Sequence, residues 1–251
     1  MKTSGDEGQK QILLFCFPFA GGSASAFRNF TAASGNAPEL IPLEYPAHGA
    51  RRNEPPAEDM VSLVGDILQY ISLTLRSPYA LFGHSLGAHI AFETTCKLLR
   101  LGYPPPVALL VSGACPPDRL TFDGAHRLGD EEFLGMLSEY GAIHEEILRD
   151  RELLSIVLPV VRRDFELLAE CRYTRCEPLP VPILAFGGLN DSKVSIADIL
   201  AWSRFTQKSF RVRFYSGKHF FLFTNIRQLA ADIEGQLNQL CVTGETRQQY
   251  E

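Results

Sequence analysis

A serine between two glycines lies at the start of a predicted helix and could act as a nucleophile. Residues 83–87 read G-H-S-L-G, which matches the pattern G-x-S-x-G, and they follow the apolar run 79–82 and open a helical pattern over 86–101. This context predicts a turn so sharp that a Cβ at either glycine would collide with neighbouring elements and the serine backbone would be strained. The hydroxyl of Ser85 would then face a substrate. The N–H of Leu86 would lie at the positive end of the helix, close to a developing oxyanion.

A carboxylate and a histidine follow this serine in the order acid, then base. Asp191 comes after the apolar run 181–186 in a glycine-rich loop, and His219 comes after the run 211–215. Either residue alone could be an ordinary loop side chain. A serine hydroxyl is a weak nucleophile until an imidazole accepts its proton, and the imidazole needs a carboxylate to fix its tautomer. We therefore predict Ser85 as nucleophile, His219 as general base and Asp191 as the residue that orients the base.

Small residues after the first apolar run could supply a second donor to the oxyanion. Residues 17–23 read F-P-F-A-G-G-S, and Gly21 and Gly22 would let the backbone approach a substrate closely. We expect the N–H of Ala20, together with that of Leu86, to form the oxyanion hole. A phosphate-binding glycine loop is the alternative interpretation, but the pattern G-x-x-x-x-G-K-[ST] is absent from the sequence.

Short apolar runs alternate with longer amphipathic stretches, which is typical of a parallel sheet with helices on its faces. Six runs are candidate strands: 12–17, 40–43, 79–82, 107–112, 181–186 and 211–215. The clearest helical patterns cover 60–75, 86–101, 196–205 and 225–240. The three chemical residues each follow one of the runs, so we predict an α/β protein with the α/β-hydrolase fold, a mostly parallel central sheet flanked by helices.

One stretch interrupts the alternation and predicts a helical insertion. We expect a single domain of 251 residues with a core of about 11–115 and 177–242 and, within it, a lid of helices at about 116–176. Such helices would lie above the active site, although they could instead simply pack on the sheet. Part of their apolar side chains should line a chamber, with Leu158 as one such position. The candidates are Leu134, Leu137, Ile147, Leu153, Leu154, Leu158, Phe165 and Leu168.

Charge and composition narrow the classes of partner. The formal net charge of -5 provides no basic surface for nucleic acid or an anionic membrane. The polar first ten residues and Pro18, which interrupts the run from Ile12, predict no signal peptide and no membrane span. Six cysteines lie scattered without C-x-x-C spacing, as expected of free thiols in the cytoplasm. We expect a cytoplasmic monomer.

The sequence resembles the type II thioesterases, stand-alone hydrolases that accompany nonribosomal peptide and polyketide synthases. The resemblance runs from about 13 to 240 and rests chiefly on residues 16–23 and 83–88. Further matching blocks are Tyr45-Pro46, 178–182, Gly187-Gly188 with Asp191, Trp202, and Gly217 with 219–222. One block departs from the family pattern P-G-R-G-x-R, because residues 46–51 read P-A-H-G-A-R. We interpret His48 as a substituted loop residue without chemistry, and the alternative is that it lines the mouth of the pocket.

The resemblance implies removal of stalled or wrongly loaded acyl groups from the phosphopantetheine arm of carrier domains. It implies acyl or peptidyl carrier proteins of a synthase as partners, and helices of the insertion that cover an acyl chamber and contact the carrier. No metal or organic cofactor is expected, because a thioester needs only a nucleophile, an oxyanion hole and water. Three alternatives are an esterase or lipase on free small-molecule esters, a catalytically idle carrier-binding module, and an acyltransferase.

Overall fold

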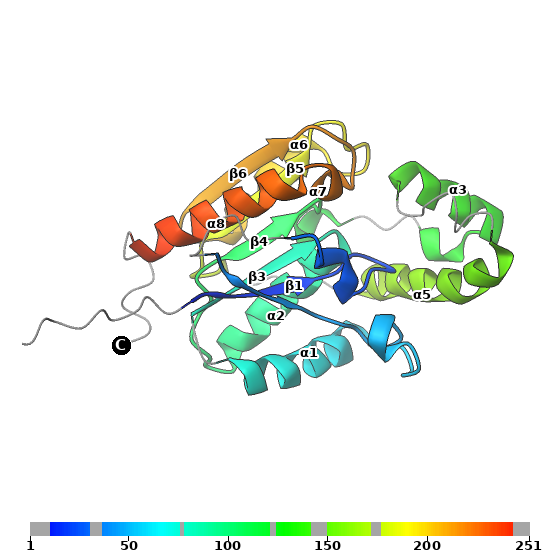
Figure 1. Ribbon diagram of the computed structural model, residues 1–251, viewed down its shortest axis with the longest axis horizontal. Coiled ribbons are helices and arrows are strands. Elements are labelled where there is room, and N and C mark those ends of the chain that lie inside the picture. Colours follow the sequence, from blue (N-terminus) through cyan, green and yellow to red (C-terminus); the bar gives the residue numbers. More distant parts are fainter. Residues whose placement is uncertain are drawn as a thin grey trace, which may run out of the picture.

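A six-stranded sheet forms the centre of the protein (Figure 1). The computed structural model describes residues 11–30, 37–75, 78–120, 124–141, 150–171 and 177–242. The strands are β1 (Leu13–Phe17), β2 (Glu39–Pro42), β3 (Tyr79–His84), β4 (Leu109–Ser112), β5 (Ile183–Gly188) and β6 (Phe210–Tyr215). They lie in the order β2-β1-β3-β4-β5-β6, and all neighbours pair in parallel. The predicted parallel sheet is therefore confirmed, and each strand overlaps one of the predicted runs.

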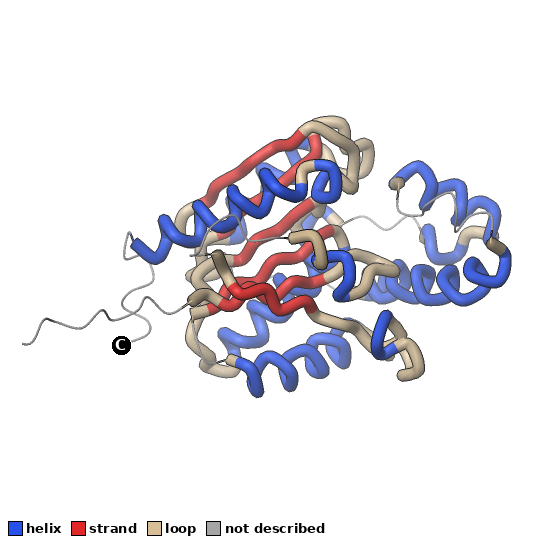
Figure 2. The backbone as a smooth tube through the Cα atoms, in the orientation of Figure 1, coloured by secondary structure: helices blue, strands red, loops and turns tan. Residues whose placement is uncertain are grey.

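Helices cover both faces of this sheet, which explains why its inner strands are apolar without alternation (Figure 2). Leu13, Phe15 and Phe17 of β1 pack on one face, and Leu14 and Cys16 pack on the other, because successive side chains point to opposite sides. The first face carries α1 (Met60–Thr74), α2 (Leu86–Arg100) and α6 (Ile196–Ala201), whereas the second carries α7 (Phe221–Thr224) and α8 (Ile226–Val242).

The helix predicted over 196–205 changes its geometry before its end. It is α-helical only to Ala201 and continues as a 3₁₀ helix over Trp202–Phe205. Trp202 is fully buried, and its indole N–H donates to the carbonyl of Ala114 over 2.8 Å. The indole thus ties this helix to the loop after β4.

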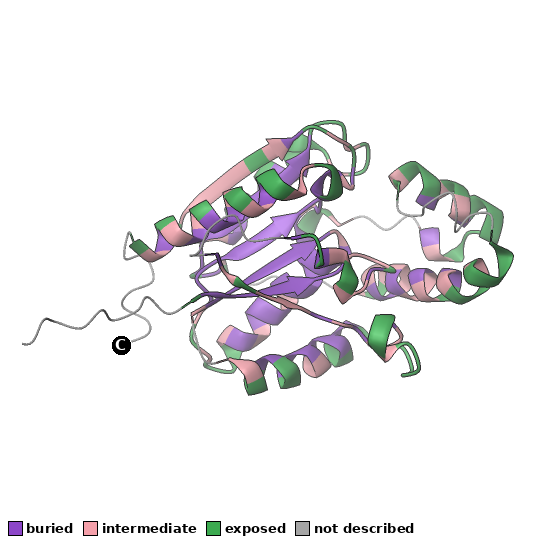
Figure 3. Ribbon diagram, in the orientation of Figure 1, coloured by how far each residue is buried: buried purple, intermediate pink, exposed green. Residues whose placement is uncertain are grey.

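The described residues between β4 and β5, where we expect a helical insertion, contain helices and no named strand. The insertion contains short 3₁₀ helices at Pro117–Arg119 and Ala125–Arg127, then α3 (Asp130–Tyr140) and α5 (Arg151–Glu170). Both long helices lie beyond the carboxyl ends of the strands (Figure 1). Figure 3 shows that these helices are mainly exposed or intermediate, whereas the inner strands β1, β3, β4 and β5 are buried. Phe133, Leu137, Leu158 and Val161 form a small apolar cluster between them, separate from the two clusters on the sheet.

Two expectations from the sequence lie outside the described residues: Ile147 as a candidate for the chamber, and the end of the insertion at about residue 176. The described helices include none that is long and apolar enough to cross a lipid bilayer.

Candidate active site

The turn between β3 and α2 holds Ser85 in the strained conformation that the sequence predicts. Its φ is 54° and its ψ is −120°, in a region that residues with a side chain rarely adopt. A Cβ on Gly83 would lie 2.1 Å from the carbonyl oxygen of Gly87, and a Cβ on Gly87 would lie 2.1 Å from that of Phe17. The N–H of Ser85 donates to the carbonyl of Ser112 over 2.8 Å. Close backbone approach therefore explains both glycines.

Three loops bring the predicted acid, base and serine into one hydrogen-bonded chain. Nε2 of His219 lies 3.0 Å from Oγ of Ser85, and Nδ1 of His219 lies 2.9 Å from Oδ2 of Asp191. A carboxylate only accepts hydrogen bonds, so Nδ1 carries the proton and Nε2 is left to accept the serine proton. The other oxygen of Asp191 accepts the N–H groups of Lys193 and Val194, at 2.8 and 3.2 Å. These bonds hold the carboxylate in place.

The imidazole of His219 is shielded from water and held by rings. Its side chain is 4% exposed, and that of Asp191 is 1% exposed. The ring of Tyr140, the last residue of α3, meets it edge-on at 5.1 Å, and the ring of Phe220 does so at 5.2 Å. The insertion thus contacts the base directly.

A second histidine lies behind His219 and is a poor candidate for the base. His84 is fully buried, its Nδ1 lies 3.0 Å from Oγ of Ser112, and its ring centre lies 5.2 Å from that of His219. Burial, followed by the charge of His219, holds the pKa of His84 well below its usual range. His84 therefore stays neutral and packs against the ring of His219.

The two residues predicted to form the oxyanion hole are found at the pocket of the serine. Ala20 and Leu86 line the same pocket as Ser85. Leu86 is the first residue of α2, where an N–H group has no partner within the helix. Across the described part of the chain, no hydrogen bond engages the N–H of Ala20 or that of Leu86. Both groups are therefore available to a ligand.

The pocket that contains Ser85 and His219 has a volume of about 350 Å³, and the insertion forms one of its walls. Phe165 and Leu168 of α5 line it, as the sequence predicts for part of the apolar set, and Met136 and Tyr140 of α3 join them. The prediction that Leu158 lines the chamber is wrong, because Leu158 packs in the cluster between α3 and α5. Apolar periodicity alone cannot distinguish a helix face that packs against another helix from one that lines a pocket. Leu137 and Leu158 are buried between α3 and α5, Leu134 packs against that cluster, and Leu153 is exposed.

Polar side chains also line this pocket. His89 lies one turn into α2, and burial lowers its pKa to about 4, so its imidazole is neutral. Burial, followed by the charge of Asp198, raises the pKa of the Cys115 thiol to about 11. Cys115 is therefore a thiol rather than a thiolate at neutral pH and a weak nucleophile.

The sequence analysis missed Asp164 of α5, which lines the same pocket and is 3% exposed. Oδ2 of Asp164 accepts the N–H of Gly21 over 2.7 Å and lies 2.9 Å from Nε2 of His48. The available signal was a charge among the apolar positions of an amphipathic helix. His48 is buried and lines a smaller cavity beside the Ser85 pocket, not the mouth of that pocket, so the alternative placement is wrong.

Comparisons with known proteins identify the family of this chain. The model of the family described as "Thioesterase domain" matches residues 13–237. Gramicidin S biosynthesis protein GrsT of Aneurinibacillus migulanus is 35% identical over 85% of this chain and 84% of its own. Thioesterase TesA of Mycobacterium marinum is 30% identical over 94% of this chain and 96% of its own.

Solved structures show the same fold. ClbQ of the colibactin nonribosomal peptide and polyketide pathway superposes with a TM-score of 0.87 at 31% identity, over 93% of this chain and 100% of that one. YbtT, a type II thioesterase of the yersiniabactin pathway, superposes with a TM-score of 0.82 at 28% identity, over 94% and 96%.

Proposed function

Because this chain belongs to the thioesterase domain family, as one of its type II members, we propose that it hydrolyses acyl thioesters on the phosphopantetheine arm of carrier domains through an acyl intermediate on Ser85. The observation that carries the proposal is the chain of hydrogen bonds from Ser85 through His219 to Asp191, at 3.0 and 2.9 Å, on the wall of a pocket of about 350 Å³.

Acylation follows from this chain of hydrogen bonds. Oγ of Ser85 attacks the thioester carbonyl while Nε2 of His219 takes its proton, and Asp191 stabilises the imidazolium without being protonated. The N–H groups of Ala20 and Leu86 donate to the oxyanion of the tetrahedral intermediate. When the intermediate collapses, the C–S bond breaks and the imidazolium gives its proton to the departing sulfur, which leaves as the thiol of the phosphopantetheine arm.

Deacylation repeats these steps with water as the nucleophile. Nε2 of His219 takes a proton from water, the hydroxide attacks the acyl ester on Ser85, and the carboxylic acid leaves as the serine recovers its proton. In this scheme the protein supplies every group that moves a proton or stabilises charge. The carrier brings its own phosphopantetheine, and the proposed steps need neither a metal nor an organic cofactor.

The names of the similar proteins support carrier domains as partners. ClbQ and YbtT are assigned to pathways with nonribosomal peptide and polyketide synthases, and GrsT to gramicidin S biosynthesis. Synthases of this kind hold their intermediates as thioesters on carrier domains. We extend that partner class to this chain.

Intact-mass spectrometry of acyl carrier proteins tests the proposal directly. Carrier loaded with acetyl, hexanoyl or decanoyl groups should lose the acyl mass when incubated with wild-type protein and keep it with Ser85→Ala. The same acyl groups offered as free oxygen esters provide the control for a general esterase. Acyl carrier that stays intact with wild-type protein, or a free ester preferred by kcat/KM, would contradict the proposal.

A further inference from the structure

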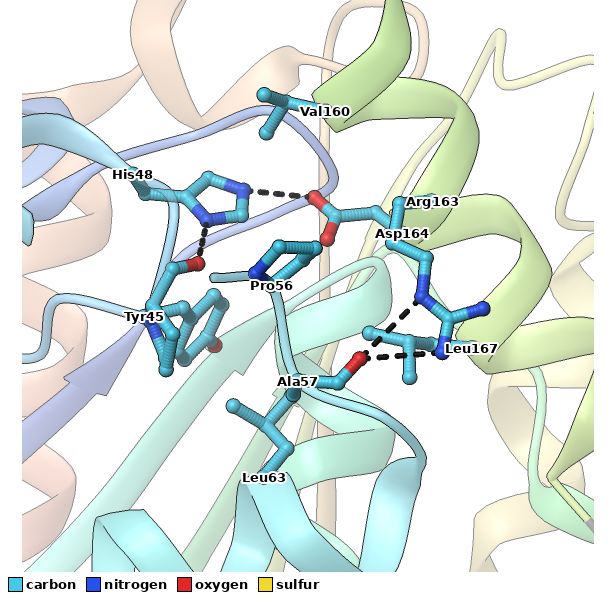
Figure 4. A pocket seen from close by; sticks show the side chains of 10 residues that line it. Tyr45, His48, Pro56, Ala57, Leu63, Val160, Arg163, Asp164 and Leu167 are labelled. Carbon is cyan, nitrogen blue, oxygen red and sulfur yellow. Dashed lines mark hydrogen bonds and ion pairs between the residues drawn. The ribbon is translucent and has the colours of Figure 1, made fainter. Parts of the chain in front are cut away.

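Asp164 of helix α5 joins two loops that lie far from it in the sequence. One oxygen, Oδ2, accepts the N–H of Gly21 in the loop after β1 over 2.7 Å and lies 2.9 Å from Nε2 of His48 in the loop after β2. The side chains of His48 and Asp164 are 5% and 4% exposed. Figure 4 shows the two side chains joined by this contact in the wall of a small cavity. This buried carboxylate, with its two donors, therefore links helix α5 to both loops.

The hydrogen bonds of His48 require a charged ring. Nδ1 lies 2.8 Å from the carbonyl oxygen of Pro46, and Nε2 faces the carboxylate of Asp164. Carbonyl and carboxylate oxygens only accept, so both ring nitrogens must donate, which an imidazolium alone can do. Burial lowers the pKa of His48, but the hydrogen bond and charge of Asp164 outweigh burial, and Pro46 and Glu44 add to them, so the pKa of His48 lies above its ordinary value.

The other charged and titratable groups around His48 leave this pair intact. Tyr45 meets the ring edge-on at 5.7 Å, and burial holds the pKa of its hydroxyl well above the usual range, so it is neutral. Glu44 lies on the loop that carries His48 and accepts the N–H of Ala24 over 3.0 Å. Arg163 lines the same cavity from α5, but its guanidinium donates to the carbonyls of Ala57 and Glu58.

Helix α5 packs directly against the loop that contains Ala20, the predicted oxyanion donor. Gly21 has a φ of 71°, and a Cβ there would lie 2.5 Å from Cγ2 of Val161. The N–H of Gly21 belongs to the peptide unit that follows Ala20. When Asp164 fixes that unit, it limits the rotation of Ala20 and thereby the direction of the Ala20 N–H.

We propose that His48 and Asp164 are positioning residues, whose ion pair holds the carboxylate against Gly21 and thereby directs the N–H of Ala20 to the oxyanion. This inference rests on the proposed hydrolysis at Ser85. It has a mechanical consequence, because α5 cannot leave the loop without releasing Gly21. A protein with α5 detached would keep the hydrogen bonds of Ser85, His219 and Asp191 but lose the alignment of one oxyanion donor.

Three variants and one matched control distinguish two roles of the ion pair. It could direct the N–H of Ala20, or it could only attach helix α5 to the rest of the fold. Asp164→Asn and His48→Gln each remove one charge of the pair, and the double variant tests whether their effects are shared. Arg163→Gln is the control, because Arg163 adjoins Asp164 on α5 and ties the same helix to residues 57 and 58 without a bond to Gly21.

The measurements are kcat and KM on acetyl-carrier protein and the affinity of an acyl trifluoromethyl ketone, which forms a tetrahedral oxyanion on a nucleophilic serine. Removal of an oxyanion donor costs about 10²- to 10³-fold in kcat, so a misdirected donor should cost about tenfold or more. We expect that loss in kcat and in ketone affinity for Asp164→Asn and His48→Gln, with KM within about twofold. The double variant should lose about as much as either single variant, because both remove the same interaction.

The pH dependence of kcat provides a second measurement, which should not change if the ion pair only attached helix α5 to the fold. Because the pKa of His48 is raised in the folded protein, the contribution of the pair is complete below about pH 6.5 and is lost as pH rises through the raised pKa. The kcat of wild-type protein should therefore fall on the alkaline side. His48→Arg, whose cation does not titrate in this range, should lack that fall.

The possible failures are distinguishable. If wild-type protein neither deacylates the carrier nor binds the ketone, the proposed function itself is wrong. If wild-type protein does both, the inference is overturned by variants that keep ketone affinity or by equal losses in Arg163→Gln. It is also overturned by an alkaline limb that is the same in wild type and His48→Arg.

Discussion

The turn that carries Ser85 and the helical insertion above it hold their residues in place by different means. The turn depends on backbone contacts, since Gly83 and Gly87 each leave no space for a Cβ and Ser85 adopts a positive φ. The insertion depends on side chains that reach across the fold, such as Asp164 to the loop after β1 and Tyr140 to His219. Backbone geometry therefore fixes the position of the nucleophile, whereas side chains of the insertion, which can be substituted, form part of the pocket wall.

Replacement of the nucleophile should have the largest effect. Ser85→Ala removes the hydroxyl that is bonded to His219 without adding strain, because alanine places the same Cβ in the same turn. We expect kcat on acetyl-carrier protein to fall by about 10⁵- to 10⁶-fold. Circular dichroism should be unchanged. A variant with near wild-type turnover would show that another residue attacks the thioester.

Asp191→Asn should be the next most severe change. The amide can donate to Nδ1 of His219, which favours the tautomer with the proton on Nε2, where it cannot accept from Ser85. We expect kcat to fall by about 10³- to 10⁴-fold with little change in KM. A nearly silent variant would indicate that a different carboxylate orients the base.

Two glycine substitutions compare the turn and the insertion directly. Gly87→Ala forces a Cβ against the carbonyl of Phe17 and should destabilise the fold by about 3 kcal/mol or more. Gly135 lies within α3 with no atom near the position of a Cβ, so Gly135→Ala should stabilise its helix by about 1 kcal/mol. Thermal unfolding of both variants checks the signs. Equal changes in unfolding temperature would mean that the turn and the insertion tolerate an added Cβ equally well.

A bulky side chain on the pocket wall should change the preference for acyl chain length more than the turnover of the shortest substrate. Leu168→Trp fills space in the pocket that contains Ser85. Each excluded methylene is worth about 1 kcal/mol, so exclusion of one or two methylenes of the longer chain should penalise decanoyl-carrier about tenfold more than acetyl-carrier. Leu158→Ala is the matched control, because Leu158 packs between α3 and α5. It should lower stability without favouring either chain length. A uniform loss with both substrates in Leu168→Trp would argue against a length-limiting wall.

The sequence predicts the fold and the hydrogen-bonded chain because their signals are local. Each strand is a short apolar run, and Ser85, Asp191 and His219 each follow one of these runs at the same edge of the sheet. The pairing of Asp164 with His48 has no such signal, since Asp164 lies inside helix α5 and not after an apolar run, and no sequence motif links it to His48. The place of Leu158 could not be predicted because the same periodicity suits both a pocket wall and a helix–helix contact.

Trp202 gives the protein a built-in optical probe. It is the only tryptophan in the sequence, it is fully buried, and it contacts the rings of Phe92 and Phe205. Its indole N–H donates to Ala114, which lines the Ser85 pocket, so its emission should respond to events one hydrogen bond away from a bound acyl group. Helices α3 and α5 contain no tryptophan. Intrinsic fluorescence therefore reports on the core and the pocket wall next to it, and an added label on the insertion could be followed at the same time without overlap.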